Sequence, residues 1–453
     1  MSFKKNLFSE INFNKNKYII YNLKKYKLSE IKEEIDKRYK KIIKIKKGIV
    51  SISSNNKIDF IINFYVCNRA GFPVYLNETE SLNKIRNEKI DINYIIKKDK
   101  ILKIRSPIKK IYKFNIILKT SGSTSLSRYV LLKNENISFI ARNMNKEMFS
   151  NKEEYNELIF APLNHAFGFG RLHSLIISKN NIVLTDQITF SNLLNLRRRF
   201  NMINSLSIPA KILATIIEMG SVTSKKILNG IRYIQVSTGH FPLKYRKKIL
   251  NLNINLFINY GMTEAIRSTF LNCFKFKNKI NTEGRPFKGI KIKIQNEKYR
   301  YGKILIKGKN LAYGYDDLEE WRKKTISGYF NSGDIGYLDN DNFLIYKFRS
   351  SGKLNINGIT YYSQNIENLI KDHFKLKNVK IFSKNNSKLI YIFLNKNIKE
   401  NKIYEFLNKK NINISFDKII KHNFLYKGTG KINFAKIIEK LKWKKKLKQL
   451  QNF

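Results

Sequence analysis

The sequence predicts an α/β protein with a large N-terminal domain of βαβ units, a small β-rich subdomain and a small α+β C-terminal domain. Helical and strand patterns alternate up to about residue 260. Short strands separated by glycine turns follow from about 284 to 347, and a mixed pattern begins after Arg349. Alternating strands and helices are typical of parallel sheets covered by helices. We therefore place the two domains at residues 1–348 and 349–453.

The first half of the chain supplies the alternating elements. Residues 28–41 predict an amphipathic helix, because apolar side chains recur at helical spacing: Leu28, Ile31, Ile35 and Tyr39. The segment KKGIVSIS predicts a strand, and DFIINFYVCNRAGFPVYL predicts a buried helix, a glycine turn and a strand. A further strand is expected at FNIILKT and a helix at 134–149, and strands and helices alternate again from about 155 to 260.

The second half of the chain has a different pattern, with short strands first and mixed strands and helices after them. The segments GIKIKI, GKILIKG and FLIYKF predict short strands of a β-rich subdomain. Beyond a boundary near 348–352, we expect a helix at 364–374, a hairpin from VKIFS and LIYIFL, and a helix near 402–409. The final KLKWKKKLKQLQNF predicts a basic helix or tail with a solvated face.

The charge balance is strongly basic, with 88 Lys and Arg against 34 Asp and Glu and a net charge of +54. A nucleic-acid-binding protein could carry such a charge. However, lysines are spread along the whole chain together with many isoleucine, asparagine, tyrosine and phenylalanine residues. That mixture is what A/T-rich codons encode, so we expect no specific nucleic-acid partner.

Other classes are excluded by what the sequence lacks. No segment approaches the roughly 20 apolar residues of a membrane span, and the first residues lack the apolar core of a signal peptide. Cys67 and Cys273 are far apart, which argues against a disulfide framework. We expect a cytoplasmic protein.

Four polar clusters follow predicted strands or glycine turns, where open α/β sheets bind ligands. The first is a hydroxyl-rich loop that suits phosphate oxygens, although the Gly-Lys-Ser of a P-loop is absent. The second, FINYGMTEA, ends a strand with a ring, a hydroxyl and a carboxylate that can hold Mg²⁺. Ser-Gly-Asp could accept hydrogen bonds from a ribose, and GTGKI presents a lysine. The residues are Thr120, Ser121, Gly122, Ser123 and Thr124; Tyr260, Thr263 and Glu264; Asp334; and Lys431.

Each cluster alone is a common turn, but their order resembles the adenylate-forming superfamily of acyl-CoA synthetases and adenylation domains. The resemblance runs from FIINFYVCNRAGFPVYLN through KTSGSTSLSRYVLL, APLNHAFGFG, VSTGHFPL, NYGMTEA, EGRPFKGIKI and GKILIKGKNLAYGYDD. It continues through GYFNSGDIGYLDNDNFLIYKFRSSGKLNINGITYYSQNIE and ends at GTGKI. It covers most of the chain and implies an AMP-forming ligase with a mobile C-terminal domain.

The resemblance also implies roles for individual residues. Thr120 to Thr124 and Arg128 would hold the ATP phosphates, and Glu264 with Thr124 would hold Mg²⁺. Tyr260 would stack on adenine beside the backbone of Thr238 and Gly239, and Thr263 would contact the α-phosphate. Asp334 and Arg349 would bind the ribose, and Lys431 would join the α-phosphate to the carboxylate during reaction. The catalytic set is therefore Lys431, Glu264, Thr263 and His165.

The chain departs from the family pattern at the phosphate loop and the hinge. Relatives have a glycine, a proline and a lysine where this chain has Ser125, Ser127 and Arg128, and their hinge pivot is Asp or Lys where this chain has Ser351. A degenerate relative that binds ATP without catalysis therefore stays open. Arg128 keeps the positive charge.

The substrate is expected to be a plain carboxylic acid. Amino-acid-activating domains use an aspartate for the ammonium group, and the matching residue here is His165, a poor partner for a cation. An amino-acid-activating, carrier-loading enzyme is the alternative. The cofactors implied are ATP, Mg²⁺ and either CoA or the phosphopantetheine of an acyl carrier protein. The segment YYSQNIE is similar to the corresponding stretch in fatty acyl-AMP ligases, which pass their product to an acyl carrier protein, so both acceptors stay open. Fatty acid metabolism is the expected context.

Overall fold

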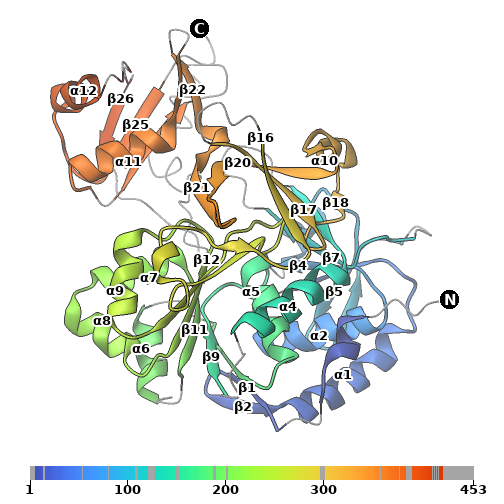
Figure 1. Cartoon of the computed structure of the whole chain (residues 1–453). Helices are drawn as coiled ribbons and strands as arrows, with labels where there is room; N and C mark the ends of the chain where they lie inside the picture. The colour runs from blue at the N-terminus through green and yellow to red at the C-terminus, as the bar shows by residue number, and fades with distance from the viewer. Residues whose placement is uncertain are drawn as a thin grey trace.

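The fold is described from a computed structural model of the 453-residue chain (Figure 1). The residues it describes are 6–13, 16–53, 55–79, 81–107, 111–120, 128–148, 154–186, 190–199, 203–295, 301–356, 359–376, 378–383, 390–410, 412, 414, 416 and 418–421.

One sheet of the N-terminal region contains seven of the described strands. Its central strands are parallel, and antiparallel strands close both ends. The order is β18 (Gly314–Tyr315), β8 (Tyr129–Leu132), β7 (Ile116–Lys119), β4 (Val74–Asn77), β3 (Ile49–Ser53), β5 (Ile92–Lys97) and β6 (Lys100–Lys103). The strands predicted at KKGIVSIS, FPVYL and FNIILKT are therefore confirmed.

A second sheet contains nine described strands, of which the central six are parallel. Its order is β15 (Arg285–Pro286), β14 (Thr269–Asn272), β13 (Asn255–Ile258), β12 (Tyr233–Ser237), β11 (Ser205–Pro209), β9 (Asn156–Ile159), β10 (Asn181–Leu184), β1 (Tyr18–Tyr21) and β2 (Lys24–Lys27). The alternation expected between 155 and 260 belongs to this sheet. The hairpin of β1 and β2, which sequence reasoning missed, extends it at the far edge.

Helices connect the parallel strands and cover the sheets (Figure 1). They are α1 (Leu28–Ile42), α2 (Lys57–Arg69), α3 (Leu82–Arg86), α4 (Asn134–Met148), α5 (Ala166–Ile176), α6 (Phe190–Arg199), α7 (Ala210–Glu218), α8 (Ser221–Leu228) and α9 (Leu243–Asn251). The helices expected at 28–41 and 134–149 are confirmed. The Asn56 side chain accepts hydrogen bonds from the backbone of Ile58 and Asp59, which fixes where α2 begins.

The β-rich subdomain is a five-stranded sheet among the described residues. It is formed by β16 (Ile290–Gln295), β17 (Gly302–Gly308), β20 (Tyr329–Leu338), β19 (Thr325–Ile326) and β21 (Leu344–Arg349), with α10 (Leu318–Lys323) beside it. The three strands predicted from glycine-separated segments are β16, β17 and β21. In Figure 1 this sheet stands above the two larger sheets.

The described residues after Arg349 form a smaller α+β unit (Figure 1, orange to red). Its elements are β22 (Lys353–Ile356), β23 (Ile359–Tyr362), α11 (Ser363–His373), β24 (Val379–Ser383), β25 (Ile390–Leu394), α12 (Glu400–Asn408) and β26 (Lys418–Lys421). The predicted hairpin is β24 with β25, which pair antiparallel. The expected basic helix or tail at the C-terminal end lies outside the described residues.

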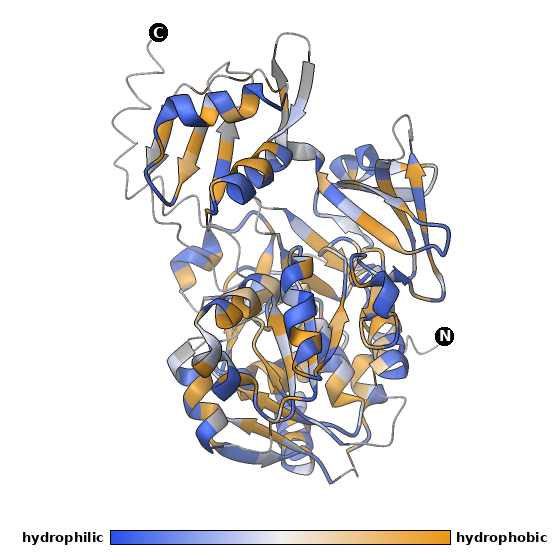
Figure 2. Ribbon diagram, turned by 60° about the vertical axis from the view of Figure 1, so that its left-hand side comes forward, coloured by the Kyte–Doolittle hydropathy of each residue, from blue (hydrophilic) through white to orange (hydrophobic). Residues whose placement is uncertain are grey.

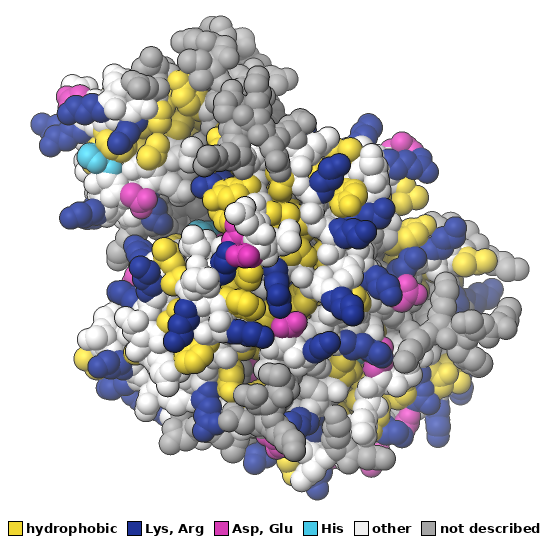
Figure 3. Space-filling model, viewed as in Figure 1, with side chains coloured by type: hydrophobic (Ala, Val, Ile, Leu, Met, Phe, Trp, Pro, Cys, Tyr) yellow, Lys and Arg dark blue, Asp and Glu magenta, His cyan; other side chains and the backbone are white. Residues whose placement is uncertain are grey.

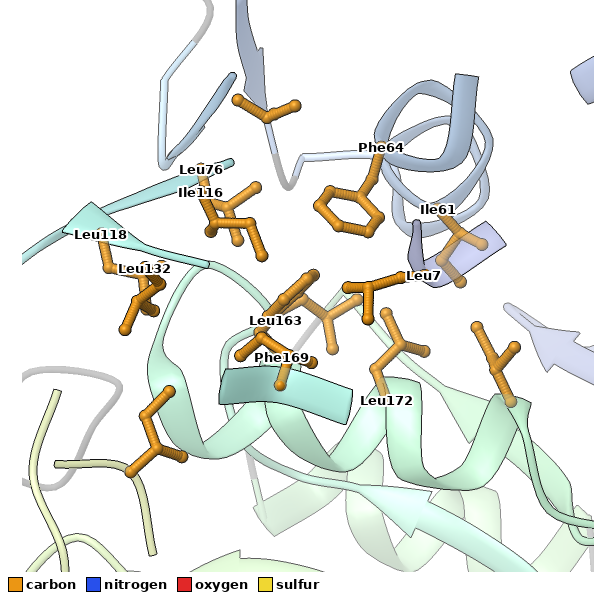
Figure 4. Close-up of a cluster of buried hydrophobic side chains, with 14 of the residues drawn as sticks. Leu7, Ile61, Phe64, Leu76, Ile116, Leu118, Leu132, Leu163, Phe169 and Leu172 are labelled. Carbon is orange, nitrogen blue, oxygen red and sulfur yellow. The ribbon is translucent and has the colours of Figure 1, made fainter. Parts of the chain in front are cut away.

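The main core lies between the seven-stranded sheet and the helices next to it. Figure 4 shows Leu76, Ile116, Leu118 and Leu132 of this sheet facing Phe169 and Leu172 of α5, with Phe64 of α2 beside them. The hydropathy colouring places apolar residues on the inner faces of strands and helices (Figure 2). A second buried cluster lies around β11 to β13, and a third lies wholly within residues 354–416.

The surface carries basic side chains without one dominant stripe on the face shown in Figure 3. This distribution agrees with lysines that are spread along the whole sequence. Both cysteines are buried and free. None of the helices in the described part of the chain has the length and apolar character needed to cross a membrane.

Candidate active site

The site is built at the carboxyl ends of two neighbouring parallel strands, β12 and β13. Thr238 and Gly239 follow β12, and Tyr260 follows β13 after one residue. Both Thr238 and Gly239 have positive φ angles, 61° and 129°, so the backbone turns sharply there. The Thr238 hydroxyl donates to the carbonyl of Ser237 at 2.6 Å, which stabilises this turn.

Asp334 connects this edge to the β-rich subdomain. The hydroxyl of Tyr260 donates to Asp334 Oδ2 at 2.8 Å, and Arg349 Nη1 donates to Oδ1 at 3.0 Å. Asp334 on β20 lies directly opposite Arg349 on β21 in the antiparallel register. The carboxylate is thus held between an aromatic ring and a cation that come from distant parts of the sequence.

Burial dominates the electrostatics of this group. The Asp334 side chain is only 5% exposed, and burial raises the pKa of its carboxyl against the opposing charge of Arg349. Burial, followed by the charge of Asp334, also raises the pKa of the Tyr260 hydroxyl well above its usual value. Burial opposes the charge on Arg349, but Asp334 raises its pKa, so the guanidinium stays charged. Half of the Arg349 side chain is exposed and available to a ligand.

Aromatic rings line the neighbouring space. Tyr346 of β21 stacks on His240 with ring centroids 6.2 Å apart, and its centroid lies 6.4 Å from that of Tyr260. His240 Nδ1 lies 3.0 Å from Glu283 Oε1, which also pairs with the buried Arg246 at 2.7 Å. Sequence reasoning missed Tyr346, because it lies in a strand whose alternation explains an aromatic residue without any site.

Glu264 lies half-buried on the loop that follows β13. Its Oε1 accepts a hydrogen bond from the hydroxyl of Tyr315 on β18 at 2.8 Å. The charge of Glu264 also raises the pKa values of Asp334 and Arg349. Glu264 and the Asp334 group therefore belong to one electrostatic unit.

The two ends of the hydroxyl-rich loop are held together next to Tyr315. The Thr120 backbone donates to the Arg128 carbonyl at 2.8 Å, and the Arg128 backbone donates to Thr120 Oγ1 at 3.2 Å. The Arg128 guanidinium lies 5.6 Å from the centre of the Tyr315 ring and forms an ion pair with Glu320. Tyr315 thus connects this loop to Glu264. Ser121, Gly122, Ser123 and Thr124 lie outside the described residues.

Two further predicted residues lie on loops near this edge. His165 is the N-cap residue of α5, and its Nε2 lies 3.4 Å from Glu78 Oε1. Thr263 is half-buried next to Glu264. Gly261 is required by close packing in the same loop, because a Cβ there would lie 2.4 Å from the backbone nitrogen of Arg267. Lys431 lies outside the described residues.

The donor set suits a magnesium nucleotide better than a metal held by protein alone. Among the described residues there is no cluster of three or more His, Cys, Asp or Glu side chains. Mg²⁺ is commonly bound through one or two carboxylates together with substrate phosphates. Glu264 offers such a carboxylate, oriented by Tyr315.

Comparison with known proteins agrees with this geometry. Residues 98–316 match the family model described as AMP-binding enzyme. The 2-succinylbenzoate–CoA ligase of Bacillus subtilis (strain 168) is 26% identical over 266 residues, which are 57% of this chain and 53% of that protein. The 2-succinylbenzoate–CoA ligase of Lactococcus lactis is 26% identical over 293 residues, which are 64% of this chain and 62% of that protein. The matched region thus spans little more than half of the relatives' length.

Solved structures extend the similarity of fold over nearly the whole chain. The o-succinylbenzoate CoA synthetase of Bacillus subtilis, in complex with the acyl-adenylate OSB-AMP, superposes with a TM-score of 0.79 at 19% identity. That match covers 95% of this chain and 97% of the other. The same enzyme in complex with ATP and magnesium ion gives a TM-score of 0.75, also at 19% identity, over 94% of this chain and 97% of the other. The α/β fold predicted from the sequence is therefore confirmed, and residues 98–316 resemble the AMP-binding enzyme family.

Proposed function

We propose that this protein is an AMP-forming acid–CoA ligase, which activates a carboxylic acid with ATP and then transfers the acyl group to CoA. The observation that carries this proposal is the buried Asp334, held between Tyr260 and Arg349 and electrostatically coupled to Glu264. A buried carboxylate with an exposed arginine beside it suits a ribose diol, and the adjacent Tyr260 ring suits a base. The match of residues 98–316 to the family model described as AMP-binding enzyme supports the same interpretation.

The first half-reaction joins two anions. A carboxylate oxygen attacks the α-phosphorus of ATP, the bond from this phosphorus to the bridging oxygen breaks, and pyrophosphate leaves. Mg²⁺ would neutralise phosphate charge when bound at Glu264. We propose that Arg128 and residues 120–124 hold the outer phosphates, Thr263 contacts the α-phosphate, and His165 borders the acid. Lys431 offsets charge at the reacting centre.

The second half-reaction moves the acyl group to a thiol. The sulfur attacks the acyl carbon and AMP leaves. We propose that residues 349–453 act as a separate domain that rotates about the hinge after Arg349, withdrawing Lys431 and admitting the thiol. The separate buried cluster within residues 354–416 supports an independently packed unit.

The relatives favour a particular acid and acceptor. Both reported relatives are named for 2-succinylbenzoate and CoA, which supports an aromatic keto diacid as substrate and CoA as acceptor. A fatty acid substrate and an acyl carrier protein acceptor find no support in these names. The histidine at position 165, where amino-acid-activating domains have an aspartate, argues against an amino acid.

ATP–pyrophosphate exchange tests this proposal. We expect exchange that depends on an added acid, strongest with 2-succinylbenzoate in a panel that includes fatty, aromatic and amino acids. Addition of CoA should then release AMP and form a thioester. Exchange with none of the acids, from protein that still binds ATP, would instead indicate a degenerate relative.

A further inference from the structure

Arg267 is a buried arginine on the same loop as Glu264, and it forms no ion pair with a carboxylate of the described residues. It is 3% exposed and has a positive φ of 42°. Its Nη2 donates to the carbonyl of Phe167 at 2.7 Å, and its guanidinium lies 5.3 Å from the centre of the Phe167 ring. Within the described part of the chain, Nε and Nη1 have no hydrogen-bond partner. Such orphaned donors on a buried charge are costly unless a ligand pairs with them.

Glu157, the buried acid whose charge acts on Arg267, already accepts hydrogen bonds from several other donors. Glu157 accepts from Arg171 Nε at 2.6 Å and from Ser205 at 2.9 Å, and both Arg171 Nη2 and the Ser207 hydroxyl donate to it as well. Two cations, Arg171 and Arg267, therefore share one buried carboxylate. Burial, with the charge of Arg171 added, lowers the pKa of Arg267 to about 9. Among the described residues, the two buried cations Arg171 and Arg267 are therefore balanced by only one buried carboxylate, that of Glu157.

The fold makes room for the guanidinium beside the start of α5. A Cβ at Gly170 would lie 2.5 Å from Arg267 Nη1, so a glycine is needed there. His165 is the N-cap of this 11-residue helix and makes no side-chain capping hydrogen bond. The first backbone N–H groups and the helix dipole add positive potential at that end. Arg267, which packs against Phe167 and Gly170, and the helix start thus add positive potential at this end of α5. The acidic neighbour of His165 there, Glu78, is largely exposed.

We propose that Arg267 binds a second carboxylate of the substrate acid, one that does not react. This inference rests on the proposed function and identifies the substrate class as dicarboxylic acids. The reacting carboxylate loses its charge when the acyl-adenylate forms, so a fixed cation would release it. A carboxylate that stays ionised through both half-reactions remains paired with Arg267 throughout. The name 2-succinylbenzoate describes an acid with two carboxyl groups, which agrees with this assignment.

The test compares acids that differ by one charge. The substrates are 2-succinylbenzoate and its two monomethyl esters, of which one leaves the reacting carboxyl free. For the unmodified protein, we expect the better ester to have a kcat/KM about 10- to 100-fold below that of the diacid, as for loss of a charged hydrogen-bonded pair. In Arg267→Leu, the kcat/KM for the diacid should fall to that for the ester, chiefly through a higher KM. The kcat/KM for the ester should be unchanged. For Arg267→Lys, the kcat/KM for the diacid should lie between that of the unmodified protein and that of Arg267→Leu.

Controls separate this inference from folding and from the proposed function. Arg322→Leu removes an exposed arginine and should leave kcat/KM unchanged for both the diacid and the ester. Equal use of diacid and ester by the unmodified protein, or equal loss of both in Arg267→Leu with ATP affinity intact, would overturn the assignment. If Arg267→Leu does not fold, the inference is tested by the kcat/KM of Arg267→Lys and by the comparison of the diacid with its monomethyl esters. If no acid supports exchange, the proposed function fails. Calorimetric binding of the diacid and the esters to the unmodified protein then still tests Arg267, and equal affinities would refute it.

Discussion

Arg349 donates a hydrogen bond to the buried carboxylate of Asp334 at 3.0 Å across two paired strands. The opposite oxygen of the same carboxylate accepts from Tyr260. Both Asp334 oxygens therefore have protein donors, and a ribose would share or replace one of them. The half-exposed Arg349 is the partner better able to move.

Asp334→Asn should weaken ATP binding by about 10- to 100-fold, because a neutral amide loses the charged hydrogen bonds made by a buried carboxylate. Titration calorimetry with ATP measures the effect. Tyr260→Phe, which keeps the ring and removes only the hydroxyl, should weaken binding less. Equal ATP affinity in Asp334→Asn and the unmodified protein would remove Asp334 from the nucleotide site.

Glu264→Gln should raise the Mg²⁺ concentration needed for half-maximal pyrophosphate exchange by roughly 10-fold or more, because an amide is a weaker ligand for a hard cation. A Mg²⁺ titration at saturating ATP measures this shift. Tyr315→Phe removes the hydrogen bond that orients Glu264 and should give a smaller shift in the same direction. An unchanged titration in Glu264→Gln would exclude the metal role.

Much of the fold follows from local sequence patterns. The helix predicted at 28–41 is observed at Leu28–Ile42, because its apolar spacing matches the residues that face the core, Leu28, Ile31 and Ile35. The hairpin of β1 and β2 was missed, because β2 is largely exposed and has no apolar alternation. Its position depends on pairing between β1 and β10, which lie about 160 residues apart in sequence.

The contacts between side chains in the site could be predicted less well from the sequence than the fold. Asp334 was a candidate from its Ser-Gly-Asp turn and Arg349 from the family resemblance, and only the register of β20 and β21 explains why they meet. Tyr315 lies inside a recognised motif and Arg267 lies two residues beyond one, but their roles depend on contacts with distant elements. The burial of Arg267 requires the glycine at position 170 of α5, a relationship that no local pattern reveals.

Lys431→Ala should abolish adenylation while leaving folding and ATP binding intact. A lysine at the reacting centre offsets the repulsion between a carboxylate and a phosphate, so its loss acts on the transition state. Pyrophosphate exchange measures the loss, and Lys427→Ala in the same segment is the matched control. Unchanged exchange in Lys431→Ala would contradict the assignment of this residue.

Gln364→Ala should alter the balance between the two half-reactions. Gln364 Oε1 accepts from the Tyr346 hydroxyl and from the Arg349 backbone, both at 3.0 Å, and so joins α11 to the strand that carries Arg349. These contacts stabilise the observed placement of α11, and each is worth about 1 kcal/mol. We expect slower adenylation, by roughly 3- to 10-fold.

Single-turnover measurements of acyl-AMP formation and of its reaction with CoA separate the two steps. If Gln364 holds the adenylating arrangement, the CoA step should be unchanged or faster in Gln364→Ala. Gln364→Glu keeps an acceptor oxygen and should retain most of the adenylation rate. Equal slowing of both steps would point to a general loss of stability.

Glu157→Gln should lower the free energy of unfolding by about 3–5 kcal/mol, because it breaks a buried ion pair and leaves Arg171 without its charge partner. Both side chains of this pair are 0% exposed, whereas those of the matched pair Arg322 and Glu319 are 71% and 67% exposed. Glu319→Gln should therefore cost at most about 1 kcal/mol. Urea unfolding of the two variants measures the difference.

The same pair predicts a pH dependence. Burial alone would raise the pKa of Glu157, but Arg171 and the two serine hydroxyls hold it below its usual value of 4.5. The unfolded chain therefore binds a proton more readily than the folded chain. Its contribution to stability is fully present above the unfolded pKa and is lost as the pH falls through the lower folded pKa. The unmodified protein should lose stability more steeply below pH 4.5 than Glu157→Gln, and parallel acid-unfolding curves for the two would contradict the assignment of Glu157 as the ionised partner of Arg171.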